Sequence, residues 1–129
     1  MIRRVVFALL AATVAAQSLA AARGVPAATP AGDPVNCVPL AQIDHTRVRD
    51  DRTIDFVMRG RDRVYRNVLP QTCPELGFEE SFAYETSLSQ LCNVDIITVL
   101  RRTAGIQRGA SCGLGLFQPV TLAGGAHAN

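Results

Sequence analysis

Four cysteines are the residues of this sequence whose types and spacing most directly suggest chemistry. Cys37, Cys73, Cys92 and Cys112 are separated by 36, 19 and 20 positions, so the CxxC or CxH pairs of zinc and thioredoxin-like redox sites are missing. In a short chain with an export signal, an even number of cysteines indicates disulfides. Four cysteines allow three pairings, which the sequence does not separate. We predict the nested one, Cys37 with Cys112 and Cys73 with Cys92, which would join both ends of the folded unit.

His45 is the histidine placed where it could act as a general base, because His127 lies in a Gly- and Ala-rich end. A catalytic triad would have to combine His45 with Asp50 or Asp55 and a serine. A histidine rarely acts as a general base without an orienting partner. We therefore expect His45 to be an exposed polar residue at the start of a strand, and we assign no catalytic residue.

Asp44, Asp50, Asp51 and Asp55 form the densest group of carboxylates in the sequence. Paired carboxylates can catalyse glycoside hydrolysis, and several together can bind calcium. Adjacent residues of a strand point to opposite faces, however, and the sequence lacks a glycine-bearing calcium loop. We expect turn hydrogen bonds and surface ion pairs here, with no metal and no cofactor.

Arg59, Arg61, Arg63 and Arg66 gather around the tip of a predicted hairpin. Guanidinium groups bind phosphate or carboxylate through paired hydrogen bonds, so these four residues are the candidate ligand-binding site. Charge on a surface hairpin also prevents edge-to-edge pairing, which is the competing interpretation.

The charge balance excludes a protein that binds nucleic acid through its overall field. All 13 basic residues are arginines, and without Arg3 and Arg4 of the signal the remaining 13 − 2 = 11 face 11 acidic residues. Aromatic residues make up 5% and tryptophan is absent, which disfavours a stacking platform for bases. The expected partner is an unknown envelope component or a small anion.

The first 22 residues have the pattern of a signal peptide: two arginines, an apolar run over residues 5–16 and small residues before the expected cut. The apolar run is too short for a permanent membrane anchor. We predict cleavage between Ala20 and Arg23 and a periplasmic or secreted protein. Residues 23–36 should form a flexible leader, residues 37–120 the folded domain and residues 121–129 a disordered tail.

Within the folded unit, apolar residues alternate with polar ones. Ile54, Phe56 and Met58 should face a core, and residues 53–59 should form a hairpin with residues 64–69. Further strands are expected over residues 81–86, 95–100 and 112–120, with Gly113 and Gly115 marking a bulge or close backbone contact. Helical turns are predicted only near residues 38–43 and 87–91. The fold class is mainly β, a small antiparallel β-barrel or sandwich of about five or six strands with two disulfides.

Four stretches of the sequence carry a family resemblance: DDRTIDF, VYRNVLPQTCPELGF, LSQLCNVDIITVL and GASCGLGLFQPV. Together with the cysteine spacing, they resemble a family of small exported proteobacterial proteins described only as a domain of unknown function. The resemblance implies export, paired cysteines and one β-rich domain, and it transfers no functional residue.

These observations favour a non-enzymatic binding module of the cell envelope. One alternative is a small exported hydrolase that uses His45 with nearby Asp residues. Another is an inhibitor of an exported enzyme, for which an exposed loop between Cys73 and Cys92 would be the place of contact.

Overall fold

The computed structural model describes residues 24–60, 62–86 and 88–126. The predicted signal segment, Arg61, Ser87 and the last three residues lie outside the described residues. In the part of the chain that is described, no helix is both long enough and apolar enough to cross a membrane.

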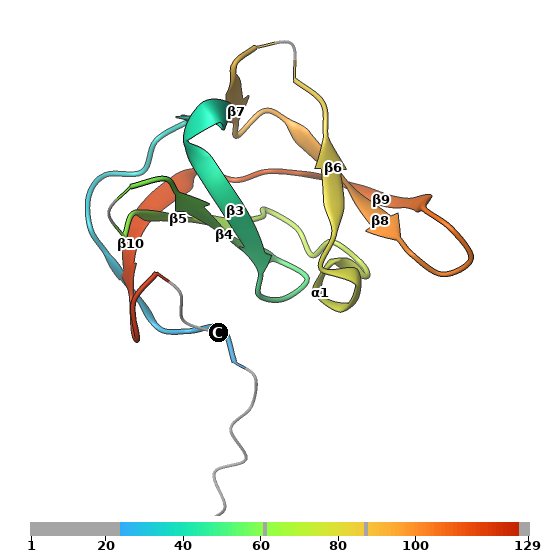
Figure 1. Cartoon of the computed structure of the whole chain (residues 1–129), viewed down its shortest axis with the longest axis horizontal. Helices are drawn as coiled ribbons and strands as arrows, with labels where there is room; N and C mark the ends of the chain where they lie inside the picture. Colours follow the sequence, from blue (N-terminus) through green and yellow to red (C-terminus); the bar gives the residue numbers. More distant parts are fainter. Residues whose placement is uncertain (1–23, 61, 87, 127–129) are drawn as a thin grey trace, which may run out of the picture.

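A five-stranded antiparallel sheet forms one layer of the molecule (Figure 1). Its strand order is β1-β10-β5-β4-β3. The strands are β1 (Ala28–Pro30), β3 (Ile43–Val48), β4 (Thr53–Met58), β5 (Val64–Val68) and β10 (Phe117–Leu122). The predicted hairpin is confirmed, because β4 pairs with β5 from Thr53 opposite Val68 to Val57 opposite Val64.

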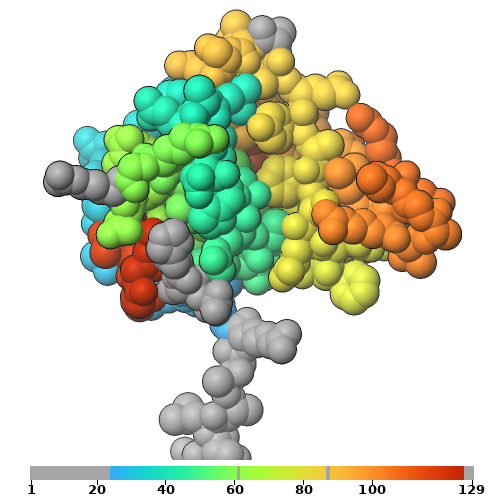
Figure 2. Space-filling model, viewed as in Figure 1, coloured from blue at the N-terminus to red at the C-terminus, as the bar shows by residue number. Residues whose placement is uncertain are grey.

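A three-stranded antiparallel sheet and a two-stranded one complete the fold, so the predicted mainly β class is confirmed in a sandwich-like form. The three-stranded sheet has the order β6-β8-β9, and β2 pairs with β7. The bounds are β2 (Cys37–Pro39), β6 (Phe82–Tyr84), β7 (Gln90–Cys92), β8 (Ile96–Arg101) and β9 (Gln107–Gly113), with a short helix α1 (Leu76–Glu79) and a 3-10 turn (Leu40–Gln42). The β8–β9 hairpin protrudes from one side of the molecule (Figures 1 and 2).

The main core lies between the five-stranded and three-stranded sheets. Phe56 on β4 is fully buried and meets Phe117 and Phe82 edge-on, with ring centroids 5.2 Å and 6.5 Å away. Ile97 and Val99 of β8 belong to the same buried cluster. Burial of such side chains and edge-to-face ring contacts stabilise small β folds, so Phe56 is the centre of this packing.

The other face of the five-stranded sheet is covered as well. Val57, Val64, Val120 and Leu122 form a second apolar cluster there, closed by Ala126. The alternation in residues 53–59 is typical of a strand with one buried face, but all six residues of β4 are buried, the polar Thr53 and Asp55 included. Alternation of apolar and polar residues identifies two faces, but a polar residue can be buried when it finds charged partners.

The segments predicted to be a flexible leader and tail contribute to this second cluster. Residues 28–30 form β1, which pairs with β10, and β10 continues to Leu122. Ala27 O accepts a hydrogen bond from Ala123 N–H at 2.9 Å. The ordered unit is therefore longer at both ends than residues 37–120. These segments consist largely of small residues and prolines and bury little apolar surface of their own. The sequence therefore contains no apolar alternation that identifies strands in them.

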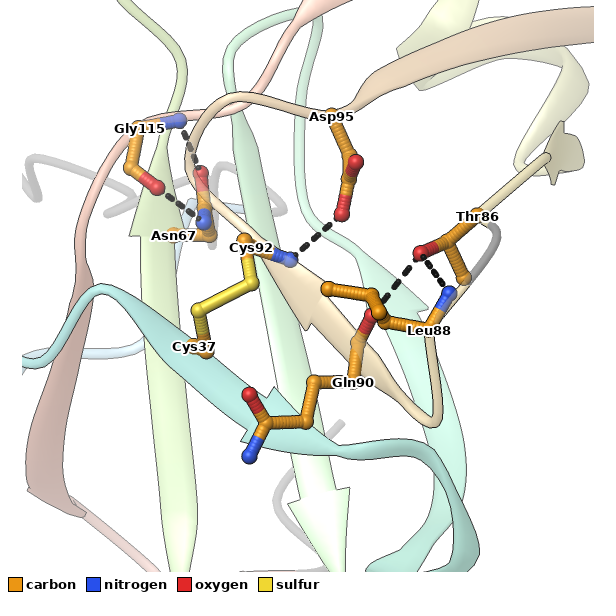
Figure 3. The surroundings of a disulfide bond; sticks show 8 residues. All are labelled: Cys37, Asn67, Thr86, Leu88, Gln90, Cys92, Asp95 and Gly115. Carbon is orange, nitrogen blue, oxygen red and sulfur yellow. Dashed lines mark hydrogen bonds between the residues drawn. A yellow bond between two sulfur atoms is a disulfide. The ribbon is translucent and has the colours of Figure 1, made fainter.

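The disulfides join Cys37 to Cys92 and Cys73 to Cys112, so the predicted nested pairing is wrong. Cys37 and Cys92 lie directly opposite each other where β2 pairs with β7, as Figure 3 shows. Cys73, in the loop after β5, reaches Cys112 on β9. Strand pairing between distant segments decides which cysteines meet, and separation along the sequence does not reveal it.

Local elements also differ from the predicted ones. Residues 38–43 form the end of β2, a single 3-10 turn and the first residue of β3, and the predicted helical turn near residues 87–91 includes most of β7. The predicted last strand, residues 112–120, is divided into β9 and β10. Gly115 lies at this division, and a Cβ there would meet Val68 O at 2.2 Å, which confirms the expected close backbone contact. The described residues thus contain ten strands, several of only three residues.

Candidate functional site

The predicted arginine site is only partly assembled at the end of the β4–β5 hairpin. Met58 N–H donates to Arg63 O at 2.9 Å and closes the hairpin, which leaves Arg59 and Arg63 exposed at its tip. A hollow of about 300 Å³ beside Arg59 is also lined by Asp44 and Asp62. Positive charge is therefore not concentrated there, because two carboxylates lie in the same hollow.

Arg66 is directed away from the tip into an ion cluster, so it is not part of the predicted ligand site. Its Nε and Nη2 donate to the Asp55 carboxylate at 2.7 and 2.9 Å, and its Nη1 donates to Pro26 O at 2.9 Å. Arg49 Nε donates to the same carboxylate at 2.8 Å. Asp55 is fully buried, which corrects the expectation of a surface ion pair.

Register explains why this cluster forms. Asp55 on β4 lies opposite Arg66 on β5 and opposite Arg47 on β3, so a row of charged residues crosses three strands. A buried carboxylate requires compensation by charge and hydrogen bonds, which the two arginines bonded to it supply. The cluster is a structural feature of the five-stranded sheet, since its groups are committed to one another.

His45 lies on β3, and its Nδ1 is 2.8 Å from the carboxylate of Asp44. Asp50 and Asp55, the carboxylates predicted to orient His45, form hydrogen bonds with other groups. Asp50 accepts a hydrogen bond from Arg52 N–H at 2.8 Å, and Asp55 belongs to the ion cluster. The His45 ring is thus bonded to Asp44, whereas Asp50 and Asp55 accept hydrogen bonds from arginines, which differs from the arrangement that the hydrolase alternative required.

Asp50 and Asp51 perform the turn-stabilising task that the sequence predicted. The Asp51 carboxylate accepts from Gly77 N–H at 2.7 Å, and its carbonyl accepts from Cys73 N–H at 2.7 Å. These bonds attach the loop after β5 and helix α1 to the β3–β4 turn. Among the described residues, no group of three or more histidines, cysteines and carboxylates could hold a metal ion. All four cysteines are in disulfides.

The exposed apolar residues near the three-stranded sheet form a different candidate. Val94, Ile96 and Tyr84 are 81%, 57% and 41% exposed, and they line one hollow of about 310 Å³. Glu85 and Arg108, an ion pair with an N–O distance of 3.2 Å, line the same hollow. We call Tyr84, Val94 and Ile96 with this charged pair the Ile96 surface. Exposed apolar residues bordered by charge are typical of protein interaction sites.

The turn between β7 and β8 fixes the position of Val94 on this surface. The Asp95 carboxylate accepts from Cys92 N–H at 2.6 Å (Figure 3), and Asp95 N–H donates to Cys92 O at 3.0 Å. Cys92 is in turn bonded to Cys37. This tight turn is connected to β2, so Val94 is presented by a rigid part of the fold.

Sequence reasoning missed the Ile96 surface because residues 95–100 contain β-branched residues on both faces. Ile97 and Val99 are buried, whereas Ile96 is exposed beside them. Alternate residues of a strand point to the same face, so Ile96 lies with the polar Thr98 on the outer face. This period-two pattern was the signal in the sequence that could have identified Ile96 as exposed. Nothing in the sequence indicated that this face would have no covering layer.

Comparisons with known proteins identify no relative of this chain: no family model, no curated protein and no solved structure matches it.

Proposed function

We propose that this chain is a non-enzymatic binding module outside the cytoplasm, in the periplasm or the surrounding medium, and that it binds another protein of the cell envelope. The observation that carries the proposal is the Ile96 surface, where three exposed apolar residues and a charged pair line one hollow. Removing such side chains from water drives protein association, and the charged border selects the partner.

The distribution of reactive groups supports binding over catalysis. Structural interactions involve most of the potentially reactive side chains, namely the four cysteines, Asp50, Asp51 and Asp55. The inhibitor alternative requires a rigid exposed loop held by a disulfide in the segment from Cys73 to Cys92, and the ends of this segment are bonded to Cys112 and Cys37 rather than to each other. The small-anion alternative is disfavoured by Asp44 and Asp62 beside Arg59.

Export is supported by two observations of different kinds. The first 22 residues have the pattern of a cleaved signal, and two disulfides persist in oxidising compartments rather than in the cytoplasm. The resemblance to small exported proteobacterial proteins is consistent with the same proposal.

A retention experiment tests the proposal. The chain without its signal segment is immobilised and exposed to envelope extract from its own cells, as wild type, as Val94→Ser/Ile96→Thr and as Ile106→Thr. Ile106 is a matched control, because it is 76% exposed but does not line the hollow. A partner retained by the wild type and by Ile106→Thr, and lost from the double variant, is the expected result. A protein retained equally by all three forms, or none retained, contradicts the proposal.

A further inference from the structure

The outer side of β9 is an open edge of the three-stranded sheet. In the described part of the chain, β9 pairs only with β8. Leu114 N–H donates to Asp95 O at 3.1 Å in continuation of that ladder. Backbone groups of successive residues alternate between the two sides of a strand, so those of Cys112 face β8. The N–H and C=O groups of Ser111 and Gly113 consequently point away from β8.

Other sheet edges carry features that prevent pairing, and the segment of β9 from Ser111 to Gly113 lacks them. The edge strand β3 has a register shift between Ile43 and His45. β1 ends in Pro30 and, like β6, has three residues. By contrast, β9 has seven residues with no proline, and its one charged residue, Arg108, lies near its start. Its register shift against β8 falls between Arg108 and Ser111, so residues 111–113 are in regular pairing. An open edge of this kind accepts a further strand.

A cavity of about 480 Å³ lies beside this edge. One wall is the strand segment 110–113 and the other comes from residues 70–74 of the loop after β5. The Cys73–Cys112 disulfide joins the loop to the strand, so the two walls are covalently connected. The cavity size is within the usual range for ligand pockets, and a preformed site lowers the entropic cost of binding.

The lining of this cavity indicates what would occupy it. None of its lining residues is charged. A charged side chain would lose hydration there without a charged partner, so an uncharged side chain is favoured. Apart from Gln107 and the charged Arg108 at its start, a second copy of β9 would offer only small residues such as Ala110 and Ser111, which would leave most of the cavity empty.

We propose that the β9 edge and this cavity bind an extended, uncharged peptide segment of the partner protein as an added strand. The inference rests on the proposed binding function and names its recognition element. The main chain of the peptide pairs with the outward groups of Ser111 and Gly113, and one of its larger apolar side chains enters the cavity. Gly113 lies opposite Ile96 across the ladder, so the added strand is next to the Ile96 surface.

Selection from a phage-displayed library of random nine-residue peptides tests this inference on the chain without its signal segment. Enriched peptides should share an uncharged apolar residue, and the synthetic peptide should slow hydrogen exchange at the Ser111 and Gly113 amides. Ser111→Pro removes the outward N–H and should weaken binding at least about tenfold. Ser111→Ala removes the hydroxyl, which lies 3.0 Å from the Thr98 hydroxyl, and should bind like wild type.

Gly113→Lys is the second variant, because a Cβ at this position meets nothing within 4 Å and the fold should tolerate it. A lysine at this edge should reduce peptide binding, whereas Gln107→Lys, at the start of the same strand, should not. Binding unchanged in both Ser111→Pro and Gly113→Lys overturns the inference, as does the absence of enriched peptides. A dimer in light scattering that Gly113→Lys dissociates also overturns it, in favour of a second copy. If the peptide-strand inference fails in any of these ways, the proposed binding function still stands, provided that retention of the envelope partner depends on Val94 and Ile96.

Discussion

Asp55 is a carboxylate held at the centre of a sheet by two guanidinium groups. Its oxygens accept three hydrogen bonds of 2.7–2.9 Å from Arg49 and Arg66, and none of its surface is exposed. Removing one member of such a buried cluster leaves charges without compensation, which costs far more than the net value of the intact cluster.

Asp55→Ala should therefore lower the free energy of unfolding by about 3–5 kcal/mol, because two arginines would stay largely buried without their anion. Urea unfolding of the disulfide-intact protein measures the change. Asp33→Ala removes an exposed carboxylate and should change stability by less than about 0.5 kcal/mol. Equal effects of the two substitutions would show that the cluster does not hold the sheet together.

Gly115 and Gly113 are two residues apart but differ in the space around them. A methyl group at Gly115 would meet Val68 O at 2.2 Å, whereas at Gly113 it would meet nothing within 4 Å. Gly115 is also fixed by Asn67, which donates to Gly115 O at 2.7 Å and accepts from Gly115 N–H at 2.8 Å, as Figure 3 shows.

Gly115→Ala should accordingly destabilise the protein by about 1–3 kcal/mol, because the Val68 and Gly115 backbones must separate. Gly113→Ala should have a much smaller effect. Thermal and urea unfolding of both variants give the comparison, and a Gly115→Ala variant as stable as Gly113→Ala would contradict the close approach.

Each disulfide connects two elements that are distant in sequence. Cys37–Cys92 joins β2 to β7 across 55 positions, and Cys73–Cys112 joins the loop after β5 to β9 across 39 positions. The chain-entropy relation gives roughly 4 kcal/mol for each loop. These contributions are a large share of the stability expected for a small domain.

Replacing either cysteine pair with alanine should lower the free energy of unfolding by roughly 4 kcal/mol. Non-reducing peptide mapping of the wild type should recover the Cys37–Cys92 and Cys73–Cys112 peptides. Recovery of Cys37 linked to Cys112, or of Cys73 linked to Cys92, would show that the strand pairing described here is wrong.

Elements with strong alternation could be predicted from the sequence, and elements fixed by distant contacts could not. Ile54, Phe56 and Met58 identified β4 because their apolar face is regular. β2 and β7 have three residues each and exist because they pair with each other. The same reason explains the site: the sequence placed Arg66 in a ligand-binding site, but its guanidinium binds the Asp55 carboxylate of the neighbouring strand, which only the register reveals.

The whole molecule combines a sandwich-like arrangement of sheets with the proposed binding surface at the three-stranded sheet. The β4–β5 hairpin tip, with Arg59 and Arg63, and the Ile96 surface are alternative places for a partner. The tip has carboxylates beside its arginines, and the Ile96 surface has exposed apolar groups. Burial of apolar groups provides most of the binding energy at protein interfaces, whereas charge at their edge contributes less.

The affinity of the retained envelope partner for two double variants, measured by titration calorimetry, tests this account most directly. Val94→Ser/Ile96→Thr should weaken binding at least about tenfold, since it removes exposed apolar groups at the contact. Arg59→Glu/Arg63→Glu should leave the affinity within about twofold at moderate salt. Unchanged affinity in the first variant together with lost binding in the second would contradict the account and place the partner on the hairpin arginines.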